Sequence, residues 1–279
     1  MPWLILAVLA DFGFVQLFKL GQRRQHAAPV VVAANYLTLG LCLALYLLVT
    51  QAKAPPVAAI ALGCGTGVFF IATMLLLNHT LTLAPVGAVL TSFRMSIVLP
   101  LAMGVWIWNE PLSLLQALGL ALALAALALM PAGGSTQRLA SVPKVLGLLA
   151  SIFVLQGICN TALRAVHYQG WDDFFLYILM AAGFTGGALG LVYLRLRQVR
   201  ATRAAVLFGA GIGAYNAIST PIVLTALSHF PGTTYFPIAG CGMVILDNLF
   251  AHFYWREPLS RIALLGVGVA ITSLVVILF

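Results

Sequence analysis

The sequence predicts an all-α membrane protein of ten transmembrane helices, arranged as two inverted five-helix repeats. Three observations lead to this fold. Hydrophobic residues make up 62% and charged residues only 7% of the 279-residue chain, apolar runs of spanning length follow one another with short gaps, and one junction motif occurs twice. A soluble domain carries about 25% charged residues, whereas a bilayer span needs roughly 20 apolar residues. Ten spans therefore use nearly the whole chain.

The apolar runs and the prolines between them define the individual helices. Prolines such as Pro29, Pro143 and Pro231 lie at or near predicted helix starts, where the missing N–H has no cost. The first run has no basic segment before it and contains Asp11, so we interpret it as a membrane helix and not as a cleaved signal peptide. The predicted helices cover residues 3–20, 29–50, 57–78, 84–107, 112–131, 144–165, 172–194, 203–227, 231–254 and 259–278.

Two patterns recur at nearly the same spacing along the chain. The segment Asn109–Ser113 (NEPLS) recurs as Arg256–Ser260 (REPLS), and their glutamates lie 147 residues apart (257 − 110). A glycine pair recurs at an offset of 146 (209 − 63), as Gly63 and Gly67 followed by Gly209 and Gly213. These recurrences predict a first repeat over residues 1–131, a linker over 132–143 and a second repeat over 144–279. Because five is an odd number of spans, the second repeat must enter the membrane inverted, a plan common among secondary transporters.

The basic residues predict an orientation. Lys53 and Arg164 are assigned to turns after even-numbered helices, and Arg94 lies inside a helix. The other eleven follow odd-numbered helices, namely Lys19, Arg23, Arg24, Arg138, Lys144, Arg195, Arg197, Arg200, Arg203, Arg256 and Arg261. Since cytoplasmic turns collect Lys and Arg, this count predicts both termini outside. The net charge of +8 is distributed over short turns and not over one solvated face, which argues against nucleic-acid binding.

Several functional classes lack the residues they require. The four cysteines fall inside apolar runs, and neither they nor the five histidines have the spacing of a metal site. We find no nucleophile with a neighbouring base and no phosphate-binding loop. The sequence therefore predicts neither an enzyme nor a cofactor.

The two junctions resemble a known family. Residues 100–113 and 248–260, each holding a Glu-Pro-Leu-Ser motif between the fourth and fifth helix of its half, are similar to the drug/metabolite transporter superfamily in its EamA-like branch. The resemblance implies a ten-helix basket around a central cavity, and transport of metabolites, amino acids or drugs, often outward. It also implies that both termini are cytoplasmic, in contrast to the charge count. The arginine-rich stretch typical of the family after the second helix is absent here, where only Lys53 occurs.

Three charged residues interrupt the apolar helices. Asp11, Arg94 and Asp247 are predicted to lie at similar depth, about 10–15 Å from the same membrane face at 1.5 Å per residue. A central charge costs roughly 2.5–3.5 kcal/mol on insertion scales, so such residues face a cavity or a partner. We hypothesise that Arg94 pairs with Asp247 or Asp11 near the cavity, where Arg94 binds an anionic group of the solute or controls a carboxylate that takes up protons. The alternative is a fixed structural ion pair.

Polar side chains within other helices complete the candidate site. We expect Tyr215, Asn216 and Tyr235 to contact solute, because each lies in a repeat-core helix. The alternative for such residues is hydrogen bonding between helices. Glu110, beside Pro111, is expected to stabilise the start of the helix that follows it.

These observations favour a secondary transporter in the inner (cytoplasmic) membrane. Its solute would be a small polar or amphipathic metabolite, amino-acid-like or carboxylate-bearing, moved by alternating access with proton coupling or exchange. Two alternatives stay open: an organic-cation or drug exporter using Asp11 and Asp247, and a flippase for a lipid-linked substrate. The expected partners are the solute, the lipid bilayer and protons; the sequence leaves the oligomeric state open.

Overall fold

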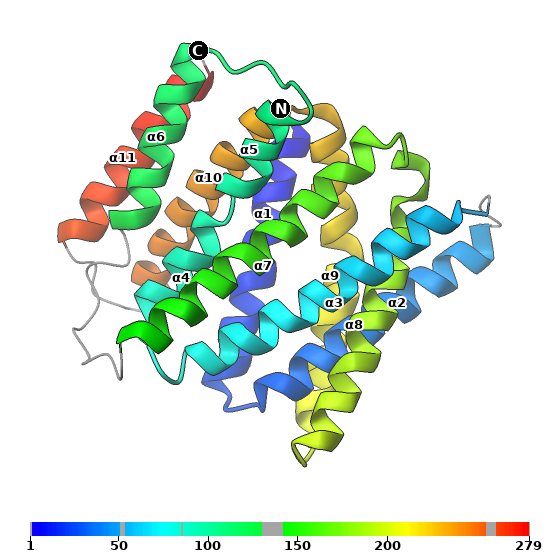
Figure 1. Ribbon diagram of the computed structural model, residues 1–279. Coiled ribbons are helices and arrows are strands. Elements are labelled where there is room, and N and C mark those ends of the chain that lie inside the picture. Colours follow the sequence, from blue (N-terminus) through cyan, green and yellow to red (C-terminus); the bar gives the residue numbers. More distant parts are fainter. Residues whose placement is uncertain (1, 51–53, 85, 130–141, 255–260, 279) are drawn as a thin grey trace.

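The computed structural model describes residues 2–50, 54–84, 86–129, 142–254 and 261–278, and within these ranges it contains helices and no strand (Figure 1). The α-helices are α1 (Pro2–Arg23), α2 (Ala28–Thr50), α3 (Val57–Thr80), α4 (Val86–Met95), α5 (Val98–Trp106), α6 (Leu114–Leu129), α7 (Val142–Tyr168), α8 (Phe175–Leu196), α9 (Arg203–His229), α10 (Gly232–Phe253) and α11 (Arg261–Leu278). A 3₁₀ turn, η2 (Asp172–Phe174), precedes α8. The prediction of an all-α protein is confirmed.

One predicted helix is broken. The sequence predicts a single helix over residues 84–107, whereas the structure has α4 and α5 separated at Ser96 and Ile97. Pro100 explains the break, because its ring removes one N–H and clashes with the carbonyl four residues earlier. That carbonyl belongs to Ser96, which instead accepts a hydrogen bond from the Leu99 N–H at 3.1 Å.

Length and hydropathy identify the membrane-crossing elements. Six helices of the described chain are long and apolar enough to span a bilayer; they begin at Pro2, Ala28, Val57, Pro143, Asp172 and Arg203. Three shorter apolar helical stretches cover Ser92–Trp106, which includes the break between α4 and α5, Leu114–Ala126 and Leu264–Ser273. The chain therefore has the helices of a multi-pass membrane protein.

Glycines bring α3 and α8 into close contact. A Cβ atom built on Gly63 would collide with the backbone carbonyl of Ile178, and one on Gly67 with that of Ala182. Small residues that let two backbones approach in this way are typical of helix association in membranes.

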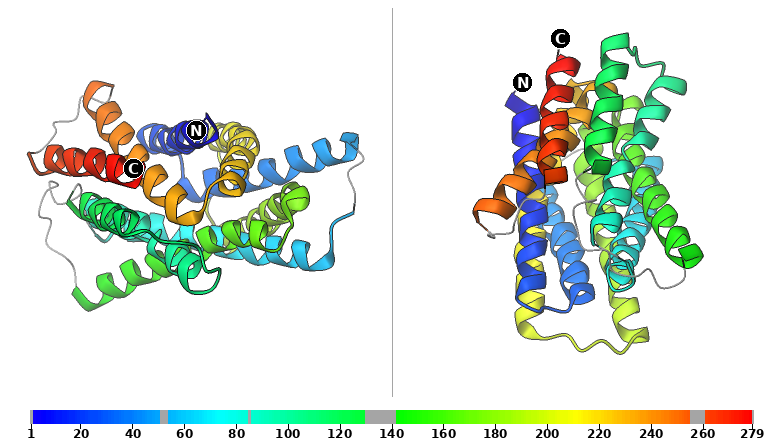
Figure 2. Two further views of the ribbon diagram at one scale, coloured as in Figure 1. Left: turned by 90° about the horizontal axis from the view of Figure 1, so that it is seen from above. Right: turned by 90° about the vertical axis from the view of Figure 1, so that its left-hand side faces the viewer.

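A second glycine-mediated contact joins α9 to α2. A Cβ atom on Gly209 would lie 2.6 Å from the carbonyl oxygen of Val31, and one on Gly213 would collide with the carbonyl of Asn35. Through these contacts and the direct packing of α2 on α8, the four helices α2, α3, α8 and α9 form one tightly packed group. Figures 1 and 2 show that α6 and α11 pair on the far side of the molecule from this group.

Substitutions in α3 test this packing. Gly63→Ala and Gly67→Ala should each destabilise the protein by about 1–3 kcal/mol, because a methyl group cannot enter the contact with α8 without moving a helix backbone. Gly65 is the matched control, since no described atom lies within 4 Å of a Cβ built there. Thermal unfolding in detergent should show a lower midpoint for the first two variants and an unchanged or higher midpoint for Gly65→Ala.

The two ends of the helix bundle differ in composition. Trp3, Trp106, Trp108 and Trp171, the four described tryptophans, flank the start of α1 and the ends of α5 and α7, and we call this the tryptophan end. The α1–α2 and α8–α9 turns lie at the other end (Figures 1 and 2), here called the arginine end. Within the described chain, these two turns and the adjoining helix ends carry six exposed arginines: Arg23, Arg24, Arg195, Arg197, Arg200 and Arg203. Aromatic belts and basic turns of this kind mark the two membrane–water interfaces.

Candidate functional site

Asp11 lies near the middle of α1, where it faces α9 and α10. Its side chain is half-buried, and α1 packs along both of these helices. The carboxyl lies within electrostatic reach of the hydroxyls of Tyr215 in α9 and Tyr235 in α10. Three of the six predicted site residues are thus brought together, from helices that are distant in the sequence.

A glycine positions Tyr215 against α1. A Cβ atom on Gly13 would overlap the Tyr215 hydroxyl, so the glycine leaves room for this ring in its observed position. The hydroxyl then donates a hydrogen bond to the backbone oxygen of Ala10 at 2.9 Å, one residue before Asp11. The ring of Tyr215 is therefore fixed beside the carboxylate.

Unpaired polar groups occur at this place in the core. Tyr235 is 3% exposed, and its hydroxyl has no hydrogen-bond partner among the described residues. Asp11 likewise makes no ion pair or hydrogen bond within the described part of the chain. Buried polar groups are nearly always paired within the protein or with water, and intramembrane carboxylates almost always have a partner or face a cavity. The Asp11 carboxylate, as an acceptor, and the Tyr235 hydroxyl, as a donor, are thus available to a ligand.

The structure tests one of the two ion pairs predicted for Arg94. Arg94 is half-buried at the end of α4, beside the helix break, and no ion pair joins it to Asp11 in the described ranges. Asp247 lies in α10, but its side chain is outside the described residues, so the pair of Arg94 with Asp247 stays a prediction.

Asn216 forms a hydrogen bond with α2. Its side-chain amide donates to Oδ1 of Asn35 at 3.4 Å, and its own oxygen accepts from the Thr220 hydroxyl. Asn216 thus makes the hydrogen bond between helices that was the alternative given for it above, and its contact with solute stays a prediction.

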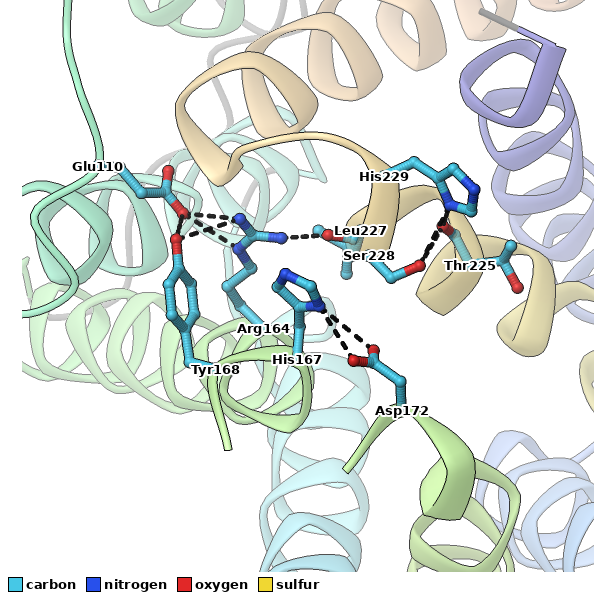
Figure 3. Close-up of polar contacts among 9 residues, drawn as sticks. All are labelled: Glu110, Arg164, His167, Tyr168, Asp172, Thr225, Leu227, Ser228 and His229. Carbon is cyan, nitrogen blue, oxygen red and sulfur yellow. Dashed lines mark hydrogen bonds and ion pairs between the residues drawn. The ribbon is translucent and has the colours of Figure 1, made fainter. Parts of the chain in front are cut away.

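A second polar cluster lies at the tryptophan end, and Figure 3 shows its contacts. The carboxylate of Glu110, in the segment between α5 and α6, accepts hydrogen bonds from Nε and Nη2 of Arg164 at 3.1 and 2.8 Å. It also accepts from the Tyr168 hydroxyl at 2.5 Å and from the backbone N–H of Thr233 at 2.9 Å. Arg164 also donates to the carbonyl oxygen of Leu227 and, through Nη2, to the Tyr168 hydroxyl at 3.3 Å. One carboxylate thereby ties the α5–α6 segment to α7 and α10, and through Arg164 to α9.

Aromatic rings pack around this ion pair. The ring of Trp108 stacks on that of Tyr168, with centroids 4.4 Å apart, and the Arg164 guanidinium lies 4.9 Å from the centroid of the Tyr168 ring. The side chains of Glu110 and Arg164 are each only 3% exposed. The low exposure strengthens every charge interaction in the cluster.

The expected role of Glu110 is corrected. It stabilises the N-terminal end of a helix, but that helix is α10 and not the following α6. The start of α6 is capped by Ser113 and Gln116, whose side chains and backbone N–H groups bond reciprocally at 3.1 Å.

Arg164 was also misassigned, to a turn between helices. The structure continues α7 to Tyr168 and buries Arg164 within it. Without Arg164, Lys53 alone remains of the basic residues assigned to turns after even-numbered helices, which strengthens the predicted asymmetry between the two sets of turns. The spacing of Arg164 and Tyr168, four residues apart and therefore on one helix face, was the available signal.

The environment of the Glu110 carboxyl predicts that the stability of the fold depends on pH. Burial alone would raise its pKa, but the hydrogen bonds from Tyr168, Thr233 and Arg164 and the charge of Arg164 together hold the pKa below its ordinary value of 4.5. A carboxyl whose pKa is lower in the folded state stabilises that state above its unfolded pKa, and the stabilisation is lost as the pH falls through the folded pKa. Glu110→Gln should therefore unfold at lower temperature at pH 7, with the difference from wild type shrinking below about pH 4.5. A constant difference down to pH 3 would contradict this assignment.

Two described grooves lie away from both clusters. One of about 620 Å³ runs between α6 and α11, and one of about 430 Å³ lies at the end of α8. Neither is lined by a predicted site residue, so the central cavity implied by the family resemblance stays a prediction.

Comparisons with known proteins support the fold and name no function. No family model matches the chain. It is 21% identical over 286 residues to an uncharacterized protein of Haemophilus influenzae, an alignment covering 97% of this chain and 95% of that protein. It also resembles a protein of known crystal structure, with a TM-score of 0.77 at 14% identity, covering 99% of this chain and 94% of the other. At this identity the likeness shows a shared fold alone.

Proposed function

We propose that this protein is a secondary transporter of the inner membrane, related to the EamA-like drug/metabolite transporters, which moves a small solute carrying a protonated amine. Amino-acid-like metabolites and organic cations both fit this description. One observation carries the proposal: Asp11, without a partner in the described chain, lies with Tyr215 and Tyr235 between α1, α9 and α10. An intramembrane carboxylate of this kind is by default a functional group.

The packing of glycines supports two inverted halves of five spans each. In this plan α4 and α5 form one broken span. Helix α2 of the first half is equivalent to α8 of the second, and α3 is equivalent to α9. Gly63 meets Ile178 and Gly209 meets Val31; these partners lie 147 residues apart (178 − 31), close to the 146 that separates the glycines. A two-fold relation between the halves would produce this correspondence, with the glycine contacts at the interface between them.

The chemistry of the site favours an amine over a carboxylate as the recognised group. A carboxylate accepts the N–H donors of an ammonium ion with charge assistance, and the Tyr235 hydroxyl adds a polar contact inside an otherwise apolar wall. The same carboxylate can bind either a proton or the ammonium group. Competition between the two would couple solute movement to protons or permit exchange.

The Glu110 cluster supplies a closure for one end of this transport path. It joins a segment of the first half to three helices of the second, with both charges buried. Alternating access requires the two ends to open in turn, so these bonds would form when the tryptophan end is closed and break when it opens.

Binding to purified protein tests the proposed solute class. Thermal unfolding in detergent should shift upward with small aromatic or aliphatic amines, and not with carboxylates of matched size that lack an amine. A ligand present at 100 times its Kd stabilises by about 2.7 kcal/mol, which such an assay detects. Stabilisation by carboxylates alone would refute the amine assignment and favour Arg94 as the anchor. Stabilisation only by lipid-linked molecules would favour the flippase alternative.

A further inference from the structure

The α8–α9 turn at the arginine end carries a concentration of positive charge without matching acids. Arg195, Arg197, Arg200 and Arg203 are all exposed within nine residues of chain. Arg24, from the α1–α2 turn, adds to them, since its guanidinium lies 5.8 Å from the ring of Phe208 in the first turns of α9.

The described carboxylates lie elsewhere. Glu110, Asp172 and Asp173 are near the tryptophan end, and Asp11 lies at mid-helix. Within the described ranges, the side chains of Arg195, Arg200 and Arg203 have no ion-pair partner. Clustered like charges repel one another, so this turn favours binding of an external anion.

A groove of about 430 Å³ opens beside these arginines. It is lined by Leu191, Leu194, Arg195, Gln198, Val199 and Ala201. The chain forms it by reversing at the end of α8, where Gln198 adopts a positive φ of 51° and the Val199 N–H bonds to the Leu194 carbonyl at 3.0 Å. The walls are mainly apolar, and an arginine lies at the rim.

Exposed apolar residues continue from the groove along α8. Leu191 is 46% exposed and Leu196 is 78% exposed, on the last two turns of a helix apolar enough to span the bilayer. The groove is therefore at the depth where acyl chains meet headgroups, and basic residues at this depth attract anionic lipids.

The geometry points to a binding site for an anionic phospholipid at the end of α8, with the phosphate on Arg195 and Arg200 and the start of an acyl chain in the groove. The site matches the chemistry of both parts of the ligand. Arginine binds phosphate through paired N–H donors, and leucine, valine and alanine side chains cover the start of the acyl chain. This site is independent of the proposed transport function.

Native mass spectrometry of the detergent-purified protein, titrated with dioleoylphosphatidylglycerol, tests the proposal. Wild type should bind this lipid in preference to dioleoylphosphatidylcholine and should not bind glycerol 3-phosphate, which has the phosphate without the chains. The double variant Arg195→Gln/Arg200→Gln should bind phosphatidylglycerol about 10- to 30-fold more weakly. Ala201→Trp, which fills the groove and keeps the charge, should also weaken binding at least fivefold.

Lys144→Gln/Arg261→Gln is the matched control, because it removes two exposed positive charges from other helix starts. It should bind phosphatidylglycerol as wild type does. Equal binding by the two double variants would overturn the site, and unchanged binding by Ala201→Trp would reduce it to general surface attraction. Glycerol 3-phosphate binding as tight as that of the lipid would identify a soluble-anion site instead. Size-exclusion chromatography of each variant verifies that it is folded.

Discussion

Replacing Arg164 by methionine is expected to destabilise the protein by about 3–5 kcal/mol, because it leaves the Glu110 carboxylate buried without its cation. The substitution also removes the bond from Arg164 to the Leu227 carbonyl and the guanidinium packed on the Tyr168 ring. For a chain of this length, 1 kcal/mol corresponds to about 2–4 °C in Tm. Circular dichroism during heating in detergent should therefore show a fall of roughly 6–20 °C.

A double variant distinguishes the ion pair from general damage to the packing. Glu110→Met/Arg164→Met removes both charges, and apolar replacement of a whole buried ion pair is often tolerated. It should unfold at a higher temperature than Arg164→Met alone, although it still lacks the contact from Glu110 to the Thr233 N–H. If the double variant is less stable than Arg164→Met by the full cost of Glu110→Met, the two side chains do not act as a pair.

Replacing Asp11 by asparagine is expected to reduce amine transport by about 30-fold or more while leaving the protein folded. Loss of a charge that contacts a buried ligand cation costs about 2–5 kcal/mol of binding, and 2 kcal/mol is about 30-fold. Asparagine retains the size and one oxygen of aspartate, so the change tests the charge itself. The measurement is exchange of a radiolabelled amine by protein reconstituted in liposomes.

Stability separates a functional role of Asp11 from a structural one. Because Asp11 has no ion-pair partner in the described chain, its neutral replacement removes a desolvated charge and should leave Tm unchanged or raise it. Asp173→Asn, an exposed carboxylate near the start of α8, is the matched control and should retain transport. A large fall in Tm for Asp11→Asn would instead indicate that the carboxylate stabilises the fold.

Hydrophobic pattern and proline placement predicted the helices well because a membrane span is determined by local composition. The predicted helix 57–78 corresponds to α3 at Val57–Thr80, and 203–227 to α9 at Arg203–His229. The break between α4 and α5 was missed although its cause, Pro100, is visible in the sequence. A proline inside an apolar run can kink or interrupt a helix, or be accommodated within it, as Pro221 is in α9.

The candidate site was predictable in its residues more than in its geometry. A charge in an apolar run identified Asp11, and core position identified Tyr215 and Tyr235. Which of these side chains meet depends on how distant helices rotate against one another, and one sequence contains no such information. Arg164 illustrates the limit: it lies near the end of its apolar run, so composition alone assigned it to a turn, while its buried partner Glu110 lies 54 residues away.

Exchange by reconstituted wild-type protein decides whether this chain transports amines. Liposomes loaded with an unlabelled amine identified by the binding screen should take up the same amine, radiolabelled, from outside in a saturable manner, and liposomes without protein should not. This uptake should be inhibited by other protonated amines and lost in Asp11→Asn. Folded protein that binds the amine but gives no exchange above protein-free liposomes would contradict the proposal that this chain is a transporter.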